Sequence, residues 1–193
     1  MSKLLIYDLE TTGLDPKENA IHQISGIIII DGKIKENFNL RVAPHAGAVI
    51  EQKALDVGNV TEEQIMAYPP NILVHKELLK ILKPYVNKYN KKDKFHLIGF
   101  NNSHFDNPFF RAFFKLCGDE YYGSWFWPDT PDVMCLASDY LRNERSEMKN
   151  FQLRTVAEYL GIKVEEEKLH DAVYDVYLTL EIYKIVAQKP RKI

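Results

Sequence analysis

The chain has 193 residues, enough for one domain with a full hydrophobic core and too few for two large domains. Its hydrophobic fraction of 46% and charged fraction of 27% are typical of a folded chain and exclude extensive disorder. Lys and Arg number 25 against 27 Asp and Glu, a formal net charge of -2, which excludes a protein that holds nucleic acid by bulk positive charge alone. Nucleic acid remains open as a substrate.

The cysteine content and the N-terminal residues indicate a reducing compartment. Cys117 and Cys135 are too few for a disulfide framework or a cysteine-based zinc site. Asp8 and Glu10 stand where a signal peptide would continue its apolar run. The longest apolar stretch, residues 24–30, is far too short to span a bilayer. We therefore expect a cytoplasmic protein without a membrane partner.

The first part of the chain carries the pattern of antiparallel strands. Residues 4–7 form a short apolar run that predicts a buried strand, and a second strand is expected over about residues 22–30. The dipeptide Asp31-Gly32 is a strong hairpin signal. The chain should therefore return as a third strand over about residues 34–42, beside the second.

The rest of the chain favours helices with one further strand. Thr61 opens a capping-box pattern with Gln64, which predicts a short helix that ends before Pro69. A helical stripe covers residues 72–89, and a strand is expected over residues 95–100. Helical patterns follow at residues 107–116, 132–141, 151–160 and about 171–187. A hairpin followed by a strand alternating with helices predicts an α/β sheet with helices against it.

Asp8 and Glu10 are the first chemically informative pair. Residues i and i+2 of a strand point to the same face, so the two carboxylates should project together. In a half-buried site they repel each other, and either a proton or a shared cation relieves the repulsion. Hard oxygen ligands suit Mg²⁺ or Mn²⁺. On this spacing alone, however, two solvated acids at the end of a strand are the favoured interpretation.

Three separated segments change that balance. Residues 8–14 read Asp-Leu-Glu-Thr-Thr-Gly-Leu, residues 102–106 read Asn-Ser-His-Phe-Asp, and residues 170–175 read His-Asp-Ala-Val-Tyr-Asp. In this order and spacing they resemble the three motifs of the DnaQ-like exonucleases, the DEDD superfamily. His170, in the position where another branch of the family has tyrosine, assigns the chain to the DEDDh branch.

The resemblance implies a fold and an activity. The fold is ribonuclease-H-like: a mixed sheet, with antiparallel first strands and then a parallel one, flanked by helices. The motifs span residues 4 to about 186, so a single exonuclease domain is expected over residues 1–193, with a short basic C-terminal tail. The implied reaction is metal-dependent hydrolysis from the 3′ end of nucleic acid, DNA favoured, which releases nucleoside monophosphates.

Three alternatives to a DNA-directed 3′→5′ exonuclease remain open. An RNA-directed exoribonuclease of the same family would share all three motifs. A proofreading module that acts only within a polymerase complex would share them too, and polymerase association or self-association is left open. A generic metal-dependent phosphatase would share the acids, but it would not need the Thr-Thr-Gly-Leu run or the His-x4-Asp spacing.

The resemblance also implies a role for each motif residue, with two Mg²⁺ or Mn²⁺ ions as cofactors. Asp8 would bridge the two ions, Glu10 and Asp175 would complete the first site, and Asp106 would hold the second. His170 would accept the proton of the attacking water, for which an imidazole pKa near neutrality is suited. Since His170 and Asp175 cannot share one helical face, His170 is expected on the loop before the last helix.

Contacts with the substrate are implied at further positions, and His170 counts among them. Leu14 and Phe105 match positions where the family packs apolar groups against the terminal nucleotide. Thr11 would donate its backbone N–H to the terminal 3′ group. Asn102 would either contact the substrate or tie its loop to the first strand.

Two segments are not explained by the motifs. Residues 76–94 contain seven lysines against Glu77 and Asp93, a local charge of +5. A solvated helix face and loop is the favoured interpretation; if the segment does touch phosphate, affinity should fall steeply with salt. The loop over residues 118–131, which contains Trp125 and Trp127, has no clear pattern.

Overall fold

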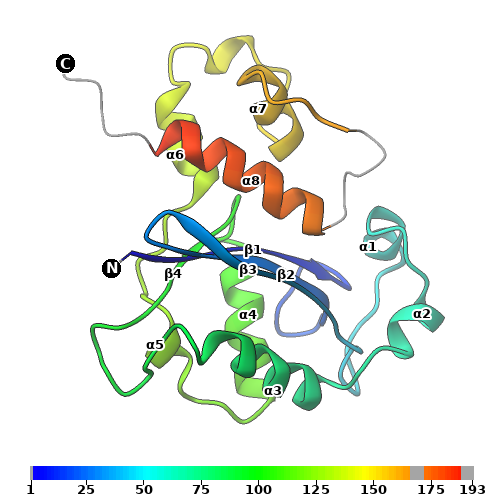
Figure 1. The fold of residues 1–193 in the computed structure, drawn as a ribbon. Helices are drawn as coiled ribbons and strands as arrows, with labels where there is room; N and C mark the ends of the chain where they lie inside the picture. Colours follow the sequence, from blue (N-terminus) through cyan, green and yellow to red (C-terminus); the bar gives the residue numbers. More distant parts are fainter. Residues whose placement is uncertain (1, 166–171, 188–193) are drawn as a thin grey trace.

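The computed structural model describes residues 2–165 and 172–187. Within them the chain forms a four-stranded sheet in the order β3-β2-β1-β4. The strands are β1 (Lys3–Thr11), β2 (Ile21–Ile30), β3 (Lys33–Arg41) and β4 (His96–Ile98). β1 pairs antiparallel with β2 and parallel with β4, and β2 pairs antiparallel with β3. The predicted mixed sheet is confirmed (Figure 1).

Helices cover both faces of this sheet. They are α1 (Gln52–Val57), α2 (Glu62–Met66), α3 (Asn71–Leu82), α4 (Asp106–Leu116), α5 (Tyr122–Trp125), α6 (Val133–Tyr140), α7 (Leu153–Tyr159) and α8 (Ala172–Val186), with a 3-10 turn at Arg145–Glu147. In Figure 1, α6, α7 and α8 lie above the sheet, and α3, α4 and α5 lie below it. None of these helices is long and apolar enough to cross a bilayer.

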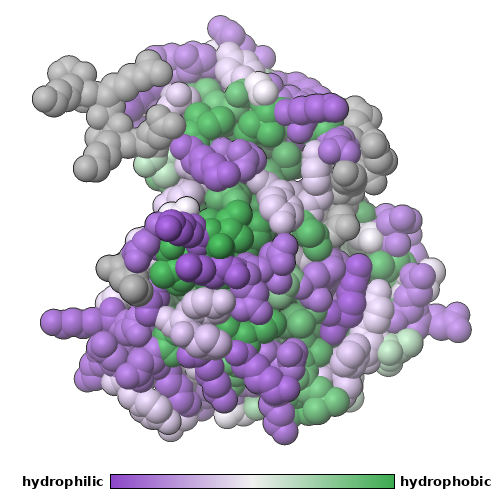
Figure 2. Space-filling model, viewed as in Figure 1, coloured by the Kyte–Doolittle hydropathy of each residue, from purple (hydrophilic) through white to green (hydrophobic). Residues whose placement is uncertain are grey.

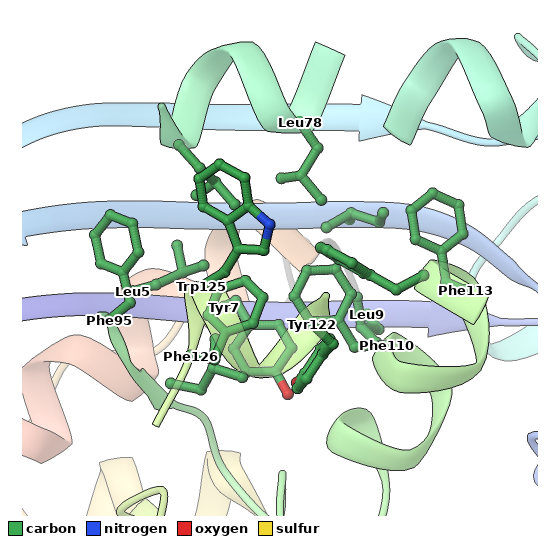
Figure 3. Packing of buried hydrophobic residues seen from close by; sticks show 14 of the residues in the cluster. Leu5, Tyr7, Leu9, Leu78, Phe95, Phe110, Phe113, Tyr122, Trp125 and Phe126 are labelled. Atoms are coloured by element: carbon green, nitrogen blue, oxygen red, sulfur yellow. The ribbon is translucent and has the colours of Figure 1, made fainter. Parts of the chain in front are cut away.

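The two faces of β1 belong to two different hydrophobic clusters, because successive side chains of a strand point to opposite sides. Leu5, Tyr7 and Leu9 face α3, α4 and α5 in an aromatic cluster (Figure 3). Ile6 faces the other way, into the cluster under α6, α7 and α8. Asp8 and Glu10 continue the face of Ile6, so the alternation that buries the core also turns both acids toward α8.

The loop around the tryptophans completes the aromatic cluster. Trp125, at the end of α5, is buried, and its carbonyl accepts the backbone N–H of Phe95 at 2.9 Å. Trp127 donates its backbone N–H to the Phe95 carbonyl at 2.9 Å and stacks on His96 at a centroid distance of 6.0 Å. The segment therefore runs beside β4 and closes that edge of the sheet.

Several predicted boundaries are wrong, for identifiable reasons. The helical stripe predicted over 72–89 ends as a helix at Leu82, because Pro84 cannot continue an α-helix. β4 is limited to residues 96–98, whereas β1 extends beyond the predicted 4–7 to Thr11. The capping box is confirmed: Thr61 and Gln64 exchange bonds of 2.8 and 3.2 Å.

Candidate active site

Three of the predicted acids lie together at the carboxyl end of β1. Asp8 and Glu10 are half-buried, and Asp175 lies in the first turn of α8. One carboxylate oxygen from each of the three lies within 4.8 Å of the other two. Residues more than 160 positions apart in the sequence thus form one acidic cluster.

Apolar packing brings α8 to this position. Val176 and Leu180 of α8 are buried in the same cluster as Ile6 and Ile27 of the sheet. Because Val176 follows Asp175 directly, its burial holds the first turn of α8 against β1. The acidic cluster is therefore fixed by the hydrophobic residues beside it.

Asp106 approaches the same strand from the side of β4. It is buried in the first turn of α4, and its Oδ1 accepts the backbone N–H of Leu9 at 3.1 Å. Leu9 lies between Asp8 and Glu10, so Asp106 is adjacent to the cluster without sharing its close oxygen contacts. Burial raises the pKa of Asp106 to about 7, although the N–H groups of Leu9 and of Asp106 itself act in the opposite direction.

The acids at this site oppose one another's ionisation. Burial raises the pKa of Asp8 well above its usual range, and the negative charges of Asp106, Glu10 and Asp175 raise it further. A bound divalent cation would remove this conflict, since its charge favours the ionised carboxylates. The donor set is made of carboxylate oxygens, which fit a hard cation such as Mg²⁺ or Mn²⁺. The site therefore fits the predicted kind of cofactor.

Asp132 is a positioning residue that the sequence reasoning missed. Its Oδ1 caps α6 by accepting the N–H of Met134 at 2.9 Å, and the same atom accepts the N–H of Asn101 at 3.0 Å. Its Oδ2 accepts the N–H of Ser103 at 3.2 Å. One carboxylate thus holds both the start of α6 and the turn that leads to Asp106. The only signal in the sequence was an Asp at the start of a predicted helix, where capping is common.

Asn102 lies inside the protein. It is fully buried, and a Cβ at Gly99 would lie 2.7 Å from the Asn102 Cβ and 3.1 Å from the Tyr7 carbonyl oxygen. Gly99 therefore permits the close packing of this turn on β1. The Asn102 side chain is therefore enclosed by the protein and is not exposed to solvent.

The loop after β1 is held by its own threonines. Thr11, which is buried, donates its hydroxyl to the Gly13 carbonyl at 2.7 Å. A Cβ at Gly13 would lie 2.3 Å from Nδ2 and 2.4 Å from Cγ of the buried Asn19 side chain, so a larger residue here would force that side chain to shift. The next side chain, Leu14, is 77% exposed and presents a free apolar surface beside the site.

The remaining predicted contacts are placed as follows. Phe105 is half-buried immediately before α4, with its ring 5.2 Å from that of Phe109. His170, the predicted general base, lies outside the described residues, as does the predicted basic tail. The two cysteines are free, as expected.

The mixed sheet and the acidic cluster at the carboxyl end of β1 define a ribonuclease-H-like protein with a site suited to divalent metal. A family model described as exonuclease, RNase_T, matches residues 5–183, and the chain therefore belongs to this exonuclease family. The match confirms the resemblance drawn from the three motifs and the predicted enzyme class.

Among curated proteins, the chain is similar to DNA polymerase III PolC-type from Thermotoga petrophila and from Clostridium perfringens. The first is 25% identical over 98% of this chain and 12% of the polymerase, and the second is 26% identical over 97% of this chain and 11% of the polymerase. The chain thus spans about an eighth of the length of these relatives.

Among solved structures, Escherichia coli exonuclease I has the same fold. In complex with a dT13 oligonucleotide it matches with a TM-score of 0.77 and 21% identity, over 97% of this chain and 41% of that one. In the zinc-bound form of its complex with single-stranded DNA, the TM-score is 0.78 and the identity 22%, over 99% of this chain and 42% of that one.

Proposed function

We propose that the chain is a metal-dependent 3′→5′ exonuclease that removes nucleoside monophosphates from the 3′ end of DNA, with residues 1–193 acting as one exonuclease domain. The observation that carries this proposal is the convergence of Asp8, Glu10 and Asp175 within 4.8 Å in a chain that matches the exonuclease family. Asp106, bonded to the strand between the first two acids, supplies the fourth carboxylate.

Two Mg²⁺ or Mn²⁺ ions are the proposed cofactors. Asp8, Glu10 and Asp175 would hold the first, and Asp8 with Asp106 would hold the second. Bound there, the ions would stabilise the charge on the attacking and leaving oxygens of an in-line displacement. The fixed positions of these side chains support this assignment, because the ligands of a catalytic ion must be held in place before the substrate arrives.

The other motif residues would handle the proton and the nucleotide. We assign His170 to accept the proton from the attacking water, since it stands two residues before the start of α8, the helix that carries Asp175. Leu14 and Phe105 would contact the terminal base, and the backbone N–H of Thr11 would bind the 3′ group. The exposed side chain of Leu14 is free for such a contact.

DNA is the favoured substrate because the curated relatives are DNA polymerases and exonuclease I was solved with DNA oligonucleotides. The same relatives make association with a polymerase the second candidate for how the domain works. We propose a cytoplasmic location and no membrane partner.

The test is to incubate the protein and Mg²⁺ with 5′-labelled single-stranded DNA, duplex DNA and RNA in parallel. The expected product is a ladder that shortens from the 3′ end, strongest with DNA. Cleavage of a closed circular DNA, which has no 3′ end, would contradict the proposal. The substitution His170→Ala should lower kcat by about 100- to 10,000-fold, with a much smaller change in affinity for nucleic acid.

A further inference from the structure

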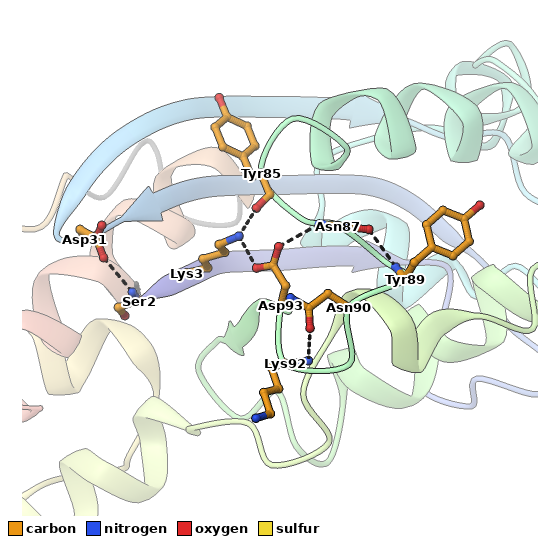
Figure 4. Close-up of polar contacts among 9 residues, drawn as sticks. All are labelled: Ser2, Lys3, Asp31, Tyr85, Asn87, Tyr89, Asn90, Lys92 and Asp93. Atoms are coloured by element: carbon orange, nitrogen blue, oxygen red, sulfur yellow. Dashed lines mark hydrogen bonds and ion pairs between the residues drawn. The ribbon is translucent and has the colours of Figure 1, made fainter.

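The segment that joins α3 to β4, residues 83–95, lies at the opposite end of β1 from the acidic cluster. We refer to it as the lysine loop. It begins at Lys83, directly after α3, and it packs against Lys3, the first residue of β1 (Figure 4). In Figure 2, hydrophilic side chains cover the lower left of the molecule, where Figure 1 places this loop.

Internal polar contacts give the lysine loop a defined shape. Lys3 donates to the Tyr85 carbonyl and forms an ion pair with Asp93. The other Asp93 oxygen accepts the N–H of Asn87 at 3.0 Å, and the Asn87 side chain accepts the N–H of Tyr89 at 3.1 Å (Figure 4). The single acid of the loop is thus occupied by Lys3 and by the backbone.

Aromatic rings gather around the loop lysines. The Lys88 ammonium lies 5.4 Å from the ring centroid of Tyr89, 5.5 Å from that of Tyr121 and 5.9 Å from that of Trp125. Tyr89 is 86% exposed and Tyr121 65% exposed, so both residues are largely open to solvent. A solvated lysine face does not by itself account for exposed rings in this position.

Lys94 repeats the arrangement with an aromatic ring of the neighbouring segment. Its ammonium lies 5.2 Å from the centroid of the Trp127 ring. The same ammonium donates to the Gly123 carbonyl at 2.5 Å. Lysine and aromatic side chains therefore alternate along this surface, from the lysine loop to the segment after α5.

The charge of this surface is strongly positive. Among the described residues, Asp93 forms an ion pair with Lys3, and Glu77 forms one with Lys80. The Asp119 carboxylate lies 3.3 Å from Nε2 of His75. The neighbouring Glu120 remains as an exposed acid. None of the five lysines of the lysine loop forms an ion pair within the described part of the chain; they are Lys83, Lys88, Lys91, Lys92 and Lys94.

We propose that this surface is a second binding site for the nucleic-acid strand, separate from the acidic cluster. The lysines would bind backbone phosphates, and unpaired bases would stack on Tyr89 and Tyr121. Positive charge that follows the backbone, combined with aromatic platforms, is how proteins bind single strands without sequence preference. An open cavity of about 630 Å³, lined by Lys88, Tyr89 and Trp125 among others, provides concave space beside the rings.

The position of the site predicts a dependence on strand length. Asp8 lies five positions after Lys3 in β1, which is about 17 Å along an extended strand. A dinucleotide held at the acids cannot reach the lysine loop, whereas a strand of twenty nucleotides can. That the bound strand is also the substrate rests on the proposed function; binding at the loop does not.

The test compares two triple variants with the wild-type chain. The loop variant is Lys88→Gln, Lys91→Gln and Lys92→Gln. The control variant changes three exposed lysines elsewhere in the same way, namely Lys35→Gln, Lys149→Gln and Lys163→Gln. Fluorescence anisotropy measures the binding of a 5′-labelled dT20 at several salt concentrations, with EDTA present so that no hydrolysis occurs.

The slope of log K against log salt should be less steep by about 2 in the loop variant, because three phosphate contacts contribute about 0.7 each. The control variant should keep the wild-type slope. Tyr89→Ala, which removes an exposed ring and no charge, should weaken dT20 binding about five- to tenfold without changing the slope. Equal slopes in both triple variants, or unchanged dT20 binding by Tyr89→Ala, would overturn the proposal that this surface binds a nucleic-acid strand. An acidic protein would then be the alternative partner for this surface.

Hydrolysis provides the arm that depends on the proposed function. With Mg²⁺ present, kcat/KM is measured on dT20 and on a dinucleotide, and the first value is divided by the second. This quotient should be smaller for the loop variant than for the control variant. If the wild-type chain hydrolyses neither substrate, the proposed function fails while the binding measurements in EDTA still decide the site. A ratio equal in both variants would show that the loop does not bind the substrate strand.

Discussion

The two ends of β1 carry opposite charge in opposite surroundings. At the carboxyl end, Asp8 lies half-buried among other acids, and its pKa is raised by burial and by their charge. At the amino end, Lys3 is satisfied by Asp93, and the lysines around it are exposed or half-exposed. The formal charge of -2 conceals this separation. The like charges of the exposed lysines are screened by water, whereas the like charges of the half-buried acids beside α8 must be neutralised by protons or cations.

Removing a charge from the acidic end should have the largest effect. Asp8→Ala should lower kcat by about a thousandfold or more, because several kcal/mol of transition-state charge stabilisation would be lost with the ions. The variant should stay folded, since the remaining acids are relieved of repulsion. Its rate is measured on labelled DNA with Mg²⁺, beside Asp139→Ala, which removes an exposed acid on α6. Wild-type activity in Asp8→Ala would contradict the proposal that Asp8 holds the catalytic metal ions.

Filling the acidic end with a cation should have the next largest effect, and it should depend on pH. The folded-state pKa values of Asp8 and Asp106 lie above their unfolded values, so the metal-free protein should lose stability as pH rises from about 4 to about 7. At pH 8, Mg²⁺ at 100 times its Kd should add about 3 kcal/mol to the free energy of unfolding. At pH 5, where these acids hold protons in the metal-free protein, it should add less.

Thermal unfolding with and without Mg²⁺ at both pH values measures this difference. The Asp8→Ala variant serves as the control and should show a smaller metal effect at pH 8. An equal Mg²⁺ effect at both pH values in the wild-type chain would contradict the idea that protons and cations compete for the acidic end.

Disturbing the turn behind Asp106 tests whether the acidic end depends on exact packing. In Gly99→Ala the new Cβ would lie 2.7 Å from the Asn102 Cβ, and overpacking of this kind costs about 2 kcal/mol. Activity should fall as well, because the turn carries Asp106. Gly123→Ala is the matched control, since nothing lies within 4 Å of its Cβ. Urea unfolding and kcat together check the outcome; equal stability of both variants would be inconsistent with tight packing here.

Removing the acid at the basic end should have the smallest effect. Asp93→Asn should lower the free energy of unfolding by about 1 kcal/mol, because Lys3 loses its partner at a partly exposed site. The hydrogen bond from Lys3 and the Asn87 N–H lower the pKa of Asp93, so this stabilisation is present above pH 3.8 and is lost as pH falls through the lower folded-state pKa. Urea unfolding at pH 7 and pH 3 should show the difference from wild type shrinking with acid.

The sequence predicted the acidic end more completely than the basic end. Strand alternation places Asp8 and Glu10 on one face, and the spacing of the motifs adds Asp175 and Asp106. The bond from Leu9 to Asp106 was not predictable, because it depends on how far β4 follows β1. The role assigned to His170 stays a prediction.

The parts that could not be predicted depend on contacts between distant segments. Asp132 looks like an ordinary helix cap, and only the folded chain brings it to the turn at Asn101. The rings around Lys88 come from two separate segments, and α5, which carries Trp125, is too short to show a helical period. The end of α3 was predictable, since Pro84 excludes the helix that its apolar stripe suggested.

The hydrogen bond from Leu9 to Asp106 has a consequence for exchange with solvent. Because β4 pairs only with residues 4–6 of β1, the Leu9 amide proton has no backbone acceptor from β4 among residues 2–165 and 172–187, and it is protected by the Asp106 carboxylate instead. Its rate of replacement by deuterium should therefore follow the state of Asp106, slow while the carboxylate accepts it and faster when the carboxylate turns away. The exchange rate of this single backbone amide, which lies between Asp8 and Glu10, would therefore report when a proton or a cation binds to the acidic cluster or leaves it, without any substrate.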